Sequence, residues 1–177
     1  MKIDDNILKQ FCLDGQDEII EKKGMTISEI LEFLRSTSKR MITKTNTYFK
    51  SDDLLEKEDC LDIIGYRFND FIQAFIDLIK YLKSIDGNPL DKKDGLSKCV
   101  WEYKRMRDKM GQDEEVFLNN MTIRNDLAHE YFSYEMNRNK LVNLITNGIE
   151  GSSAICDFFD EYCNAHNLLE GIIEHPE

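Results

Sequence analysis

Proline is nearly absent from this sequence, with only Pro89 and Pro176 in 177 residues, and glycine occurs nine times. Both residues interrupt helices, so their scarcity leaves room for long helices. No apolar run approaches the roughly 18 residues that cross a membrane. The first residues also lack the apolar stretch of a signal peptide. We therefore expect a cytoplasmic protein with no membrane segment.

The number and spacing of the cysteines disfavour both disulfide bonds and a zinc site. The five cysteines are odd in number and widely scattered, and none forms a CxxC pair. Such spacing argues against a disulfide framework and against a zinc site. We expect reduced thiols, no bound metal and no cofactor. Cys156 and Cys163 stand seven residues apart on one predicted helix face, which predicts buried thiols.

Charge is abundant and strongly uneven. The chain carries a net charge of -11, and residues 112–177 hold three basic and 13 acidic side chains. This balance argues against binding of long nucleic acids by bulk electrostatics, and no DNA binding is expected. One basic stretch contrasts with the rest, and it comprises Lys92, Lys93, Lys98, Lys104, Arg105, Arg107 and Lys109. A charge run of this kind is usually a solvated helix face.

Hydrophobic residues recur at helical spacing along most of the chain. We predict a helix capped at Thr26 or Ser28, a long one over residues 54–85 and a third over 96–110. A fourth begins near Asp113, and a last one covers 138–169 with a possible break at Gly148 or Gly151. The fold class is all-α, an antiparallel bundle of about four to five helices. Residues 1–25 form an arm or short helix, 26–170 the bundle and 171–177 a tail.

Aromatic residues fall into two groups. Phe68, Phe71 and Phe75 lie on the apolar stripe of the long second helix and are predicted core residues. Trp101 stands in the basic stretch, where it is able to stack on a nucleobase. Packing in the core or in an interface is the more common role of such a residue, and we expect it here.

One polar segment near the end of the fourth predicted helix carries candidate chemistry. Asn125 and His129 stand four residues apart and share a helix face, so the amide is able to orient the imidazole. Arg124 and His129 point about 140° apart on a straight helix, but the long arginine side chain is able to fold round toward the same edge. Histidine moves protons near neutral pH, and arginine binds phosphate with two hydrogen bonds. The group suits phosphodiester cleavage, although R-x4-H spacing alone also fits a structural histidine.

The segment resembles the HEPN superfamily, most closely its HepT-type toxins and the related nucleotidyltransferase substrate-binding proteins. The shared pattern is R-x4-H-x-Y, filled by Arg124, His129 and Tyr131, with Asn125 in the polar position after the arginine. The similarity extends to Arg67-Phe68 on the second helix and to Phe117, which stands where the family often has tryptophan. It covers about residues 60–135.

The resemblance implies a homodimeric ribonuclease that cleaves RNA without metal, in which both protomers contribute Arg124 and His129. Asn125 and Asp126 would support the site. Tyr131 would accept AMP from a separate minimal nucleotidyltransferase, the antitoxin that silences such a toxin. RNA-binding candidates in the basic stretch are Lys98, Lys104, Arg105, Arg107 and Lys109. The alternative is a non-catalytic HEPN subunit that binds a nucleotide or a nucleotidyltransferase.

Overall fold

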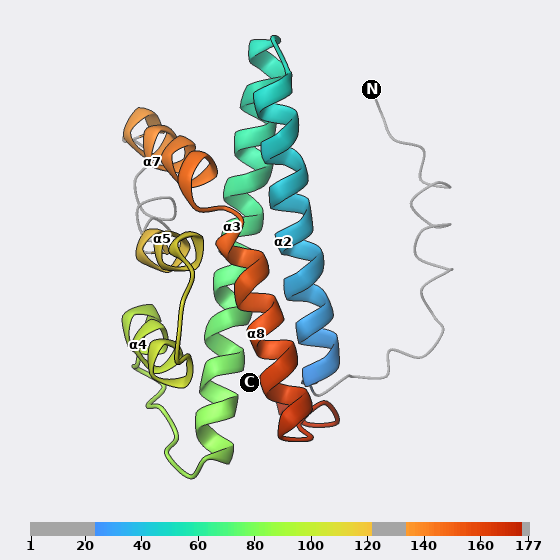
Figure 1. The fold of residues 1–177 in the computed structure, drawn as a ribbon, viewed down its shortest axis with the longest axis vertical. Coiled ribbons are helices and arrows are strands. Elements are labelled where there is room, and N and C mark those ends of the chain that lie inside the picture. Colours follow the sequence, from blue (N-terminus) through green and yellow to red (C-terminus); the bar gives the residue numbers. More distant parts are fainter. Residues whose placement is uncertain (1–23, 122–133, 175–177) are drawn as a thin grey trace, which may run out of the picture.

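The computed structural model describes residues 24–121 and 134–174, and these residues are predominantly helical (Figure 1). The expectation of an all-α fold class is confirmed. Six helices lie within these ranges: α2 (Ile27–Lys50), α3 (Leu54–Ile85), α4 (Leu96–Met106), α5 (Gln112–Asn120), α7 (Tyr134–Asn147) and α8 (Gly151–Ala165). Two three-residue strands, β1 (Gly24–Thr26) and β2 (Ile172–Glu174), pair antiparallel.

Side-chain caps fix where the two longest helices begin. At the start of α2, the Thr26 hydroxyl accepts from the Glu29 backbone N–H at 3.2 Å. The Glu29 carboxylate in turn accepts from the Thr26 N–H at 2.9 Å. These reciprocal bonds form a capping box, and they confirm the predicted cap at Thr26. Asp53 caps α3 by accepting from the Leu55 N–H at 2.9 Å.

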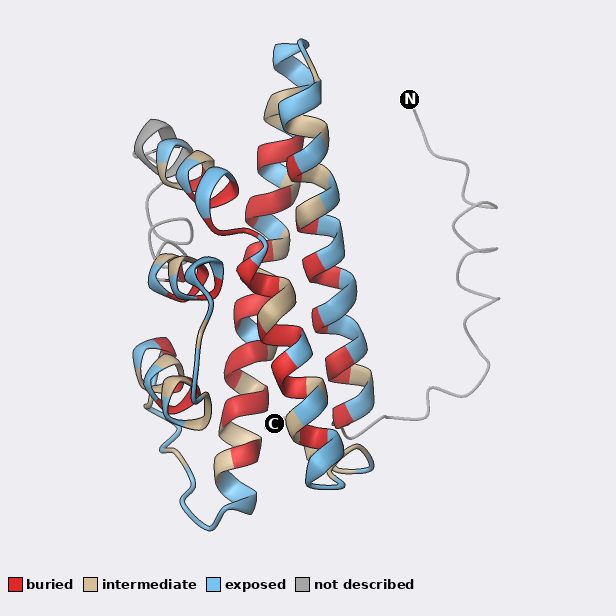
Figure 2. Cartoon of the chain, viewed as in Figure 1, coloured by how far each residue is buried: buried red, intermediate tan, exposed pale blue. Residues whose placement is uncertain are grey.

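The two longest helices, α2 and α3, form a pair on which the other helices pack. Only Ser51 to Asp53 separate the two helices, so they return alongside each other as a long hairpin (Figure 1). Helix α8 packs on α2, and α4 packs on α3. In Figure 2 the buried residues of α2, α3 and α8 lie on the faces that these helices turn toward one another. Each helix thus buries one apolar stripe and exposes a polar face.

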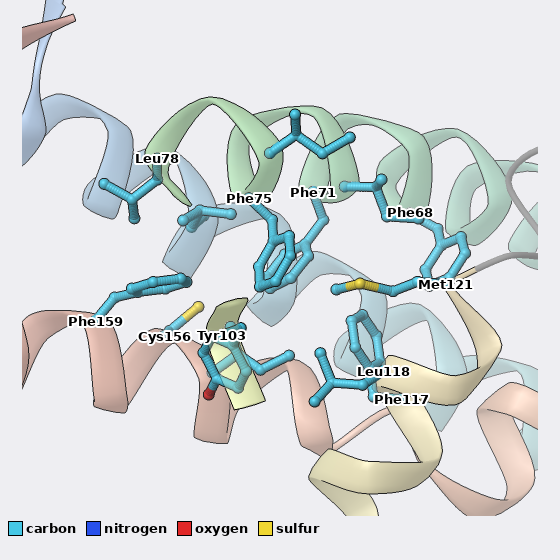
Figure 3. Packing of buried hydrophobic residues seen from close by; sticks show 14 of the residues in the cluster. Phe68, Phe71, Phe75, Leu78, Tyr103, Phe117, Leu118, Met121, Cys156 and Phe159 are labelled. Atoms are coloured by element: carbon cyan, nitrogen blue, oxygen red, sulfur yellow. The ribbon is translucent and has the colours of Figure 1, made fainter. Parts of the chain in front are cut away.

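Aromatic rings fill the centre of this core, as predicted for Phe68, Phe71 and Phe75, which are fully buried. Figure 3 shows Phe75 facing Tyr103, with Phe159 nearby, and Phe117 below Phe71. The ring of Phe75 lies 5.5 Å from that of Tyr103 and 5.8 Å from that of Phe159. Such tilted and edge-to-face pairs stabilise a core beyond the area that they bury.

The C-terminal helical region divides where its glycines approach α5. Helix α7 ends at Asn147 and α8 begins at Gly151, which confirms the predicted break. A β-carbon at Gly151 would lie 2.2 Å from the backbone oxygen of Asp113, and one at Gly148 would lie 2.4 Å from Val116. Only glycine permits this close approach between α5 and the turn from α7 to α8.

The strand pair joins the end of the predicted arm and the first residue of the predicted bundle to the predicted tail. Gly24 pairs with Glu174 and Thr26 with Ile172. The backbone N–H of Ile27 also donates to the Gly171 oxygen at 2.8 Å. These bonds tie the start of α2 to the chain that follows α8. Within the described ranges, no helix is long and apolar enough to span a membrane.

Candidate functional site

The central candidate residues lie outside the described residues: Arg124, Asn125, Asp126, His129 and Tyr131. Their predicted roles therefore stay predictions. In the sequence, the segment that contains them lies between α5 and α7, both of which the structure describes. Helix α5 is the described element that leads into this segment.

Phe117 anchors α5 to the long helix α3. Its side chain is fully buried, and its ring meets Phe68 at 5.4 Å and Phe71 at 5.3 Å in edge-to-face geometry (Figure 3). Met121, directly after α5, is also fully buried. The chain that leads into residues 124–131 is therefore held in the core up to its last described residue.

A buried polar network holds α5 against α4. The Glu114 carboxylate, which is 1% exposed, accepts from the Tyr103 hydroxyl at 2.5 Å. It also accepts from the Arg107 Nε at 3.2 Å and from the Gly111 N–H at 3.3 Å. Burial raises the pKa of Tyr103, and the hydrogen bond to Glu114 raises it further. Tyr103 is thus a permanent donor at neutral pH.

This network determines where α4 ends. The helix was predicted to continue to Met110, but it ends at Met106. Arg107 has extended backbone angles, with φ -101° and ψ 111°, and its guanidinium pairs with Glu114. Because the backbone at Arg107 is not helical, its side chain reaches the carboxylate of Glu114, seven residues further along the sequence. Arg107, one of the five RNA-binding candidates, is therefore a link between helices in this structure.

Two other candidates lie beside the only tryptophan of the chain. Lys98 Nζ lies 3.9 Å from the centre of the Trp101 ring, and the guanidinium carbon of Arg105 lies 4.6 Å from it. Lys104 donates to the Asn119 side chain of α5 at 3.3 Å. Lys109, the fifth candidate, is exposed in the loop after α4. The structure thus brings Lys98 and Arg105 together, with Lys104 on the side that faces α5.

The expectation that Trp101 packs in the core is wrong, and the alternative that it packs in an interface stays a prediction. Its side chain is 48% exposed, although it stands on an amphipathic helix. Cations at positions i-3 and i+4 cover the ring, so its apolar surface is partly shielded by lysine and arginine rather than by the core. That spacing was visible in the sequence and was the signal that could have indicated exposure.

The cysteines of the described residues have the properties expected of structural thiols. Cys60, Cys99, Cys156 and Cys163 are all free and buried. Burial raises the pKa of Cys156 to about 12 and that of Cys163 to about 11. Such thiols stay protonated and unreactive at neutral pH. This confirms the prediction made for Cys156 and Cys163.

A second feature, which no sequence pattern indicated, is a hollow of about 540 Å³ between α2, α3 and the strand pair. Its walls are largely apolar, and they include Ile30, Phe33, Ala74, Tyr81 and Ile173. The polar groups at its edge pair locally, as where Gln73 donates to Asp77 at 3.0 Å. No set of three or more His, Cys, Asp or Glu side chains that could hold a metal occurs among the described residues.

Comparisons with protein-family models, with curated proteins and with solved structures gave no match for this chain. Function is therefore inferred from the residues themselves.

Proposed function

We propose that this protein is a metal-independent endoribonuclease of the HEPN type, the toxin of a toxin–antitoxin module. The observation that carries the proposal is the segment Arg124 to Tyr131, with its R-x4-H-x-Y spacing. Two further features are consistent with it. The fold class is all-α, and a buried aromatic, Phe117, anchors the helix that precedes the segment.

The proposed reaction needs no nucleophile from the protein, because RNA supplies its own 2′-OH. His129 takes the proton of that hydroxyl as it attacks the adjacent phosphorus, and a second histidine protonates the departing 5′-oxygen. Arg124 stabilises the charge that develops on the phosphate oxygens. Asn125 and Asp126 hold the geometry. The products are a 2′,3′-cyclic phosphate end and a 5′-hydroxyl end.

Silencing by a partner enzyme completes the proposed module. A separate minimal nucleotidyltransferase would transfer AMP from ATP to the Tyr131 hydroxyl and release pyrophosphate. The added nucleotide places bulk and negative charge two residues from His129, where the RNA phosphate would otherwise bind. Because two protomers would contribute Arg124 and His129 to one site, the active form would be a homodimer.

One observation favours a second function, that of a non-catalytic subunit that binds a nucleotidyltransferase or a nucleotide. The acidic side chains of residues 112–177 outnumber the basic ones by ten, and the segment itself falls in this region. Negative charge around a site weakens its attraction for a polyanion such as RNA. A subunit that docks another protein does not face this penalty.

A paired cleavage assay separates the two functions. Wild-type protein and His129→Ala are incubated with total cellular RNA in EDTA, and the fragments are analysed for 2′,3′-cyclic phosphate ends. His166→Ala is the matched control, because His166 stacks on Tyr162 on α8 and has no proposed role. We expect cleavage by wild type and by His166→Ala but not by His129→Ala. Absence of cleavage by unmodified wild type would favour the binding subunit.

A further inference from the structure

The exposed face of α4 presents an aromatic ring between two cations. Lys98 precedes Trp101 by three residues and Arg105 follows it by four, so both lie next to the ring on one helix face. The cationic groups lie 3.9 Å and 4.6 Å from the ring centre. Attraction between a cation and an indole ring holds two flexible side chains in a defined arrangement. Their charges are thus positioned before any ligand arrives.

The same cations share one carboxylate with a third. Glu102 is 5% exposed, and its oxygens lie 3.4 Å from Lys98 Nζ, 3.5 Å from Lys83 Nζ and 3.7 Å from an Arg105 nitrogen. These separations exceed the 2.7–2.9 Å of a strong charge-assisted hydrogen bond. Glu102 therefore holds the three cations at these longer distances, and Lys83 Nζ also lies 3.7 Å from the Asp86 carboxylate. The N–H donors of Lys98 and Arg105, whose side chains are exposed, stay accessible. We call this cluster, formed by Lys83, Lys98, Trp101, Glu102 and Arg105, the Trp101 surface.

Helix α4, which carries most of the Trp101 surface, is linked by side chains to α5, the helix that precedes the proposed catalytic segment in the sequence. Lys104, next to Arg105 in sequence, donates to Asn119 near the end of α5. Arg124 follows Asn119 by five residues in the sequence. In Figure 1, α5 lies above α4, and both lie on the opposite side of α3 from α2.

We propose that the Trp101 surface binds the phosphate backbone of the single-stranded RNA that the protein cleaves. The inference rests on the proposed function, since it names the substrate path of that site. Lys98 and Arg105 contact phosphate oxygens, and the indole edge contacts a neighbouring base. Cations combined with an exposed aromatic ring are typical of proteins that bind single strands. A patch this small suits a flexible strand better than the rigid phosphate spacing of a duplex.

Binding is tested without cleavage in the His129→Ala background. The probe is a short fluorescein-labelled oligouridylate, and the readout is fluorescence anisotropy across a salt series. The test variant adds Lys98→Gln and Arg105→Gln. The matched control adds Lys39→Gln and Arg40→Gln, two adjacent exposed cations on α2. We expect the test variant to bind at least tenfold more weakly and the control to bind as the parent does.

The salt dependence distinguishes lost phosphate contacts from a general loss of structure. Each cation that contacts a phosphate contributes about 0.7 to the slope of log K against log salt for a single strand. Removing two should make the slope shallower by about 1.4. An unchanged slope and unchanged affinity in the test variant would overturn the proposal.

Trp101 gives a second readout that requires no variant at the cation positions. It is the only tryptophan of the chain, so its emission reports on this surface alone. Unlabelled oligouridylate should quench it with the affinity that the anisotropy gives. Binding without any change in emission would contradict the proposal. So would polyglutamate that binds as tightly as the RNA, because the surface would then fit an acidic protein.

The two proposals fail in different ways. If the wild-type protein binds RNA at the Trp101 surface but does not cleave it, the ribonuclease proposal is refuted and the RNA-binding proposal stands. Cleavage that depends on His129 but is unaffected by Lys98→Gln and Arg105→Gln would refute the surface and leave the ribonuclease.

Discussion

Replacing Glu114 by glutamine tests the network that joins α4 to α5. The amide oxygen is able to keep the bond from the Tyr103 hydroxyl, but the NH₂ group then faces Arg107 and the Gly111 N–H, which are donors as well. Breaking a buried ion pair costs about 3–5 kcal/mol. The Arg107 side chain is 28% exposed and regains some hydration, so we expect a loss of about 2–3 kcal/mol. For a chain of this size, that lowers Tm by about 4–12 °C.

The neighbouring Glu115→Gln is the control, because Glu115 is exposed on the same first turn of α5. The Glu115→Gln variant loses the same charge near the same helix N-terminus. Its free energy of unfolding should stay within about 0.5 kcal/mol of the wild-type value. Stability is measured by urea unfolding followed by circular dichroism. A double-mutant cycle with Tyr103→Phe should give a coupling of about 0.5–3 kcal/mol. If Glu114→Gln behaves like Glu115→Gln and shows no coupling, the network does not stabilise the fold as argued.

Three further predictions follow from packing and burial. Phe117→Ala should cost about 3–5 kcal/mol in urea unfolding, because a fully buried ring is lost from the contact between α5 and α3. Gly151→Ala should lower Tm through an overpacking cost of about 1–3 kcal/mol, since its β-carbon meets the Asp113 backbone at 2.2 Å. Burial raises the pKa of Cys156 from 9.0 to about 12, so its contribution to stability is full below pH 9 and is lost as pH rises toward 12. Cys156→Ala should therefore flatten the fall of the urea midpoint over that pH range, and an unchanged fall would contradict the assignment.

The helices could be predicted because their signals are local. Thr26 and Glu29 stand at capping-box spacing, and Asp53 precedes an apolar stripe, so both helix starts follow from a few neighbouring residues. The end of α4 does not follow from neighbouring residues. It depends on Arg107, whose backbone is not helical and whose guanidinium pairs with the Glu114 carboxylate of α5. The strand pair was missed for a similar reason. Its two strands have three residues each and lie far apart in the sequence, so neither has a pattern of its own.

The candidate site was predictable in part. The five RNA-binding candidates were chosen for charge alone, and charge does not reveal which cations have buried partners. Arg107 has one in Glu114, whereas Lys98 and Arg105 share Glu102 at longer distances. Lys83 of α3 lies near the same carboxylate, and only the tertiary fold reveals that it belongs to this cluster. The roles of Arg124, His129 and Tyr131 remain predictions from sequence.

The net charge of -11 is a weaker argument against RNA binding than it first suggests. At physiological salt, electrostatic interactions between exposed charges are largely screened beyond about 8 Å. A phosphate at Lys98 and Arg105 therefore responds mainly to the charges beside it, where three cations lie near the two carboxylates of Glu102 and Asp86. The acidic side chains of the C-terminal region act at longer range, and they matter most at low salt. Local charge thus favours RNA at the Trp101 surface, while the total charge favours short single strands over long or duplex RNA.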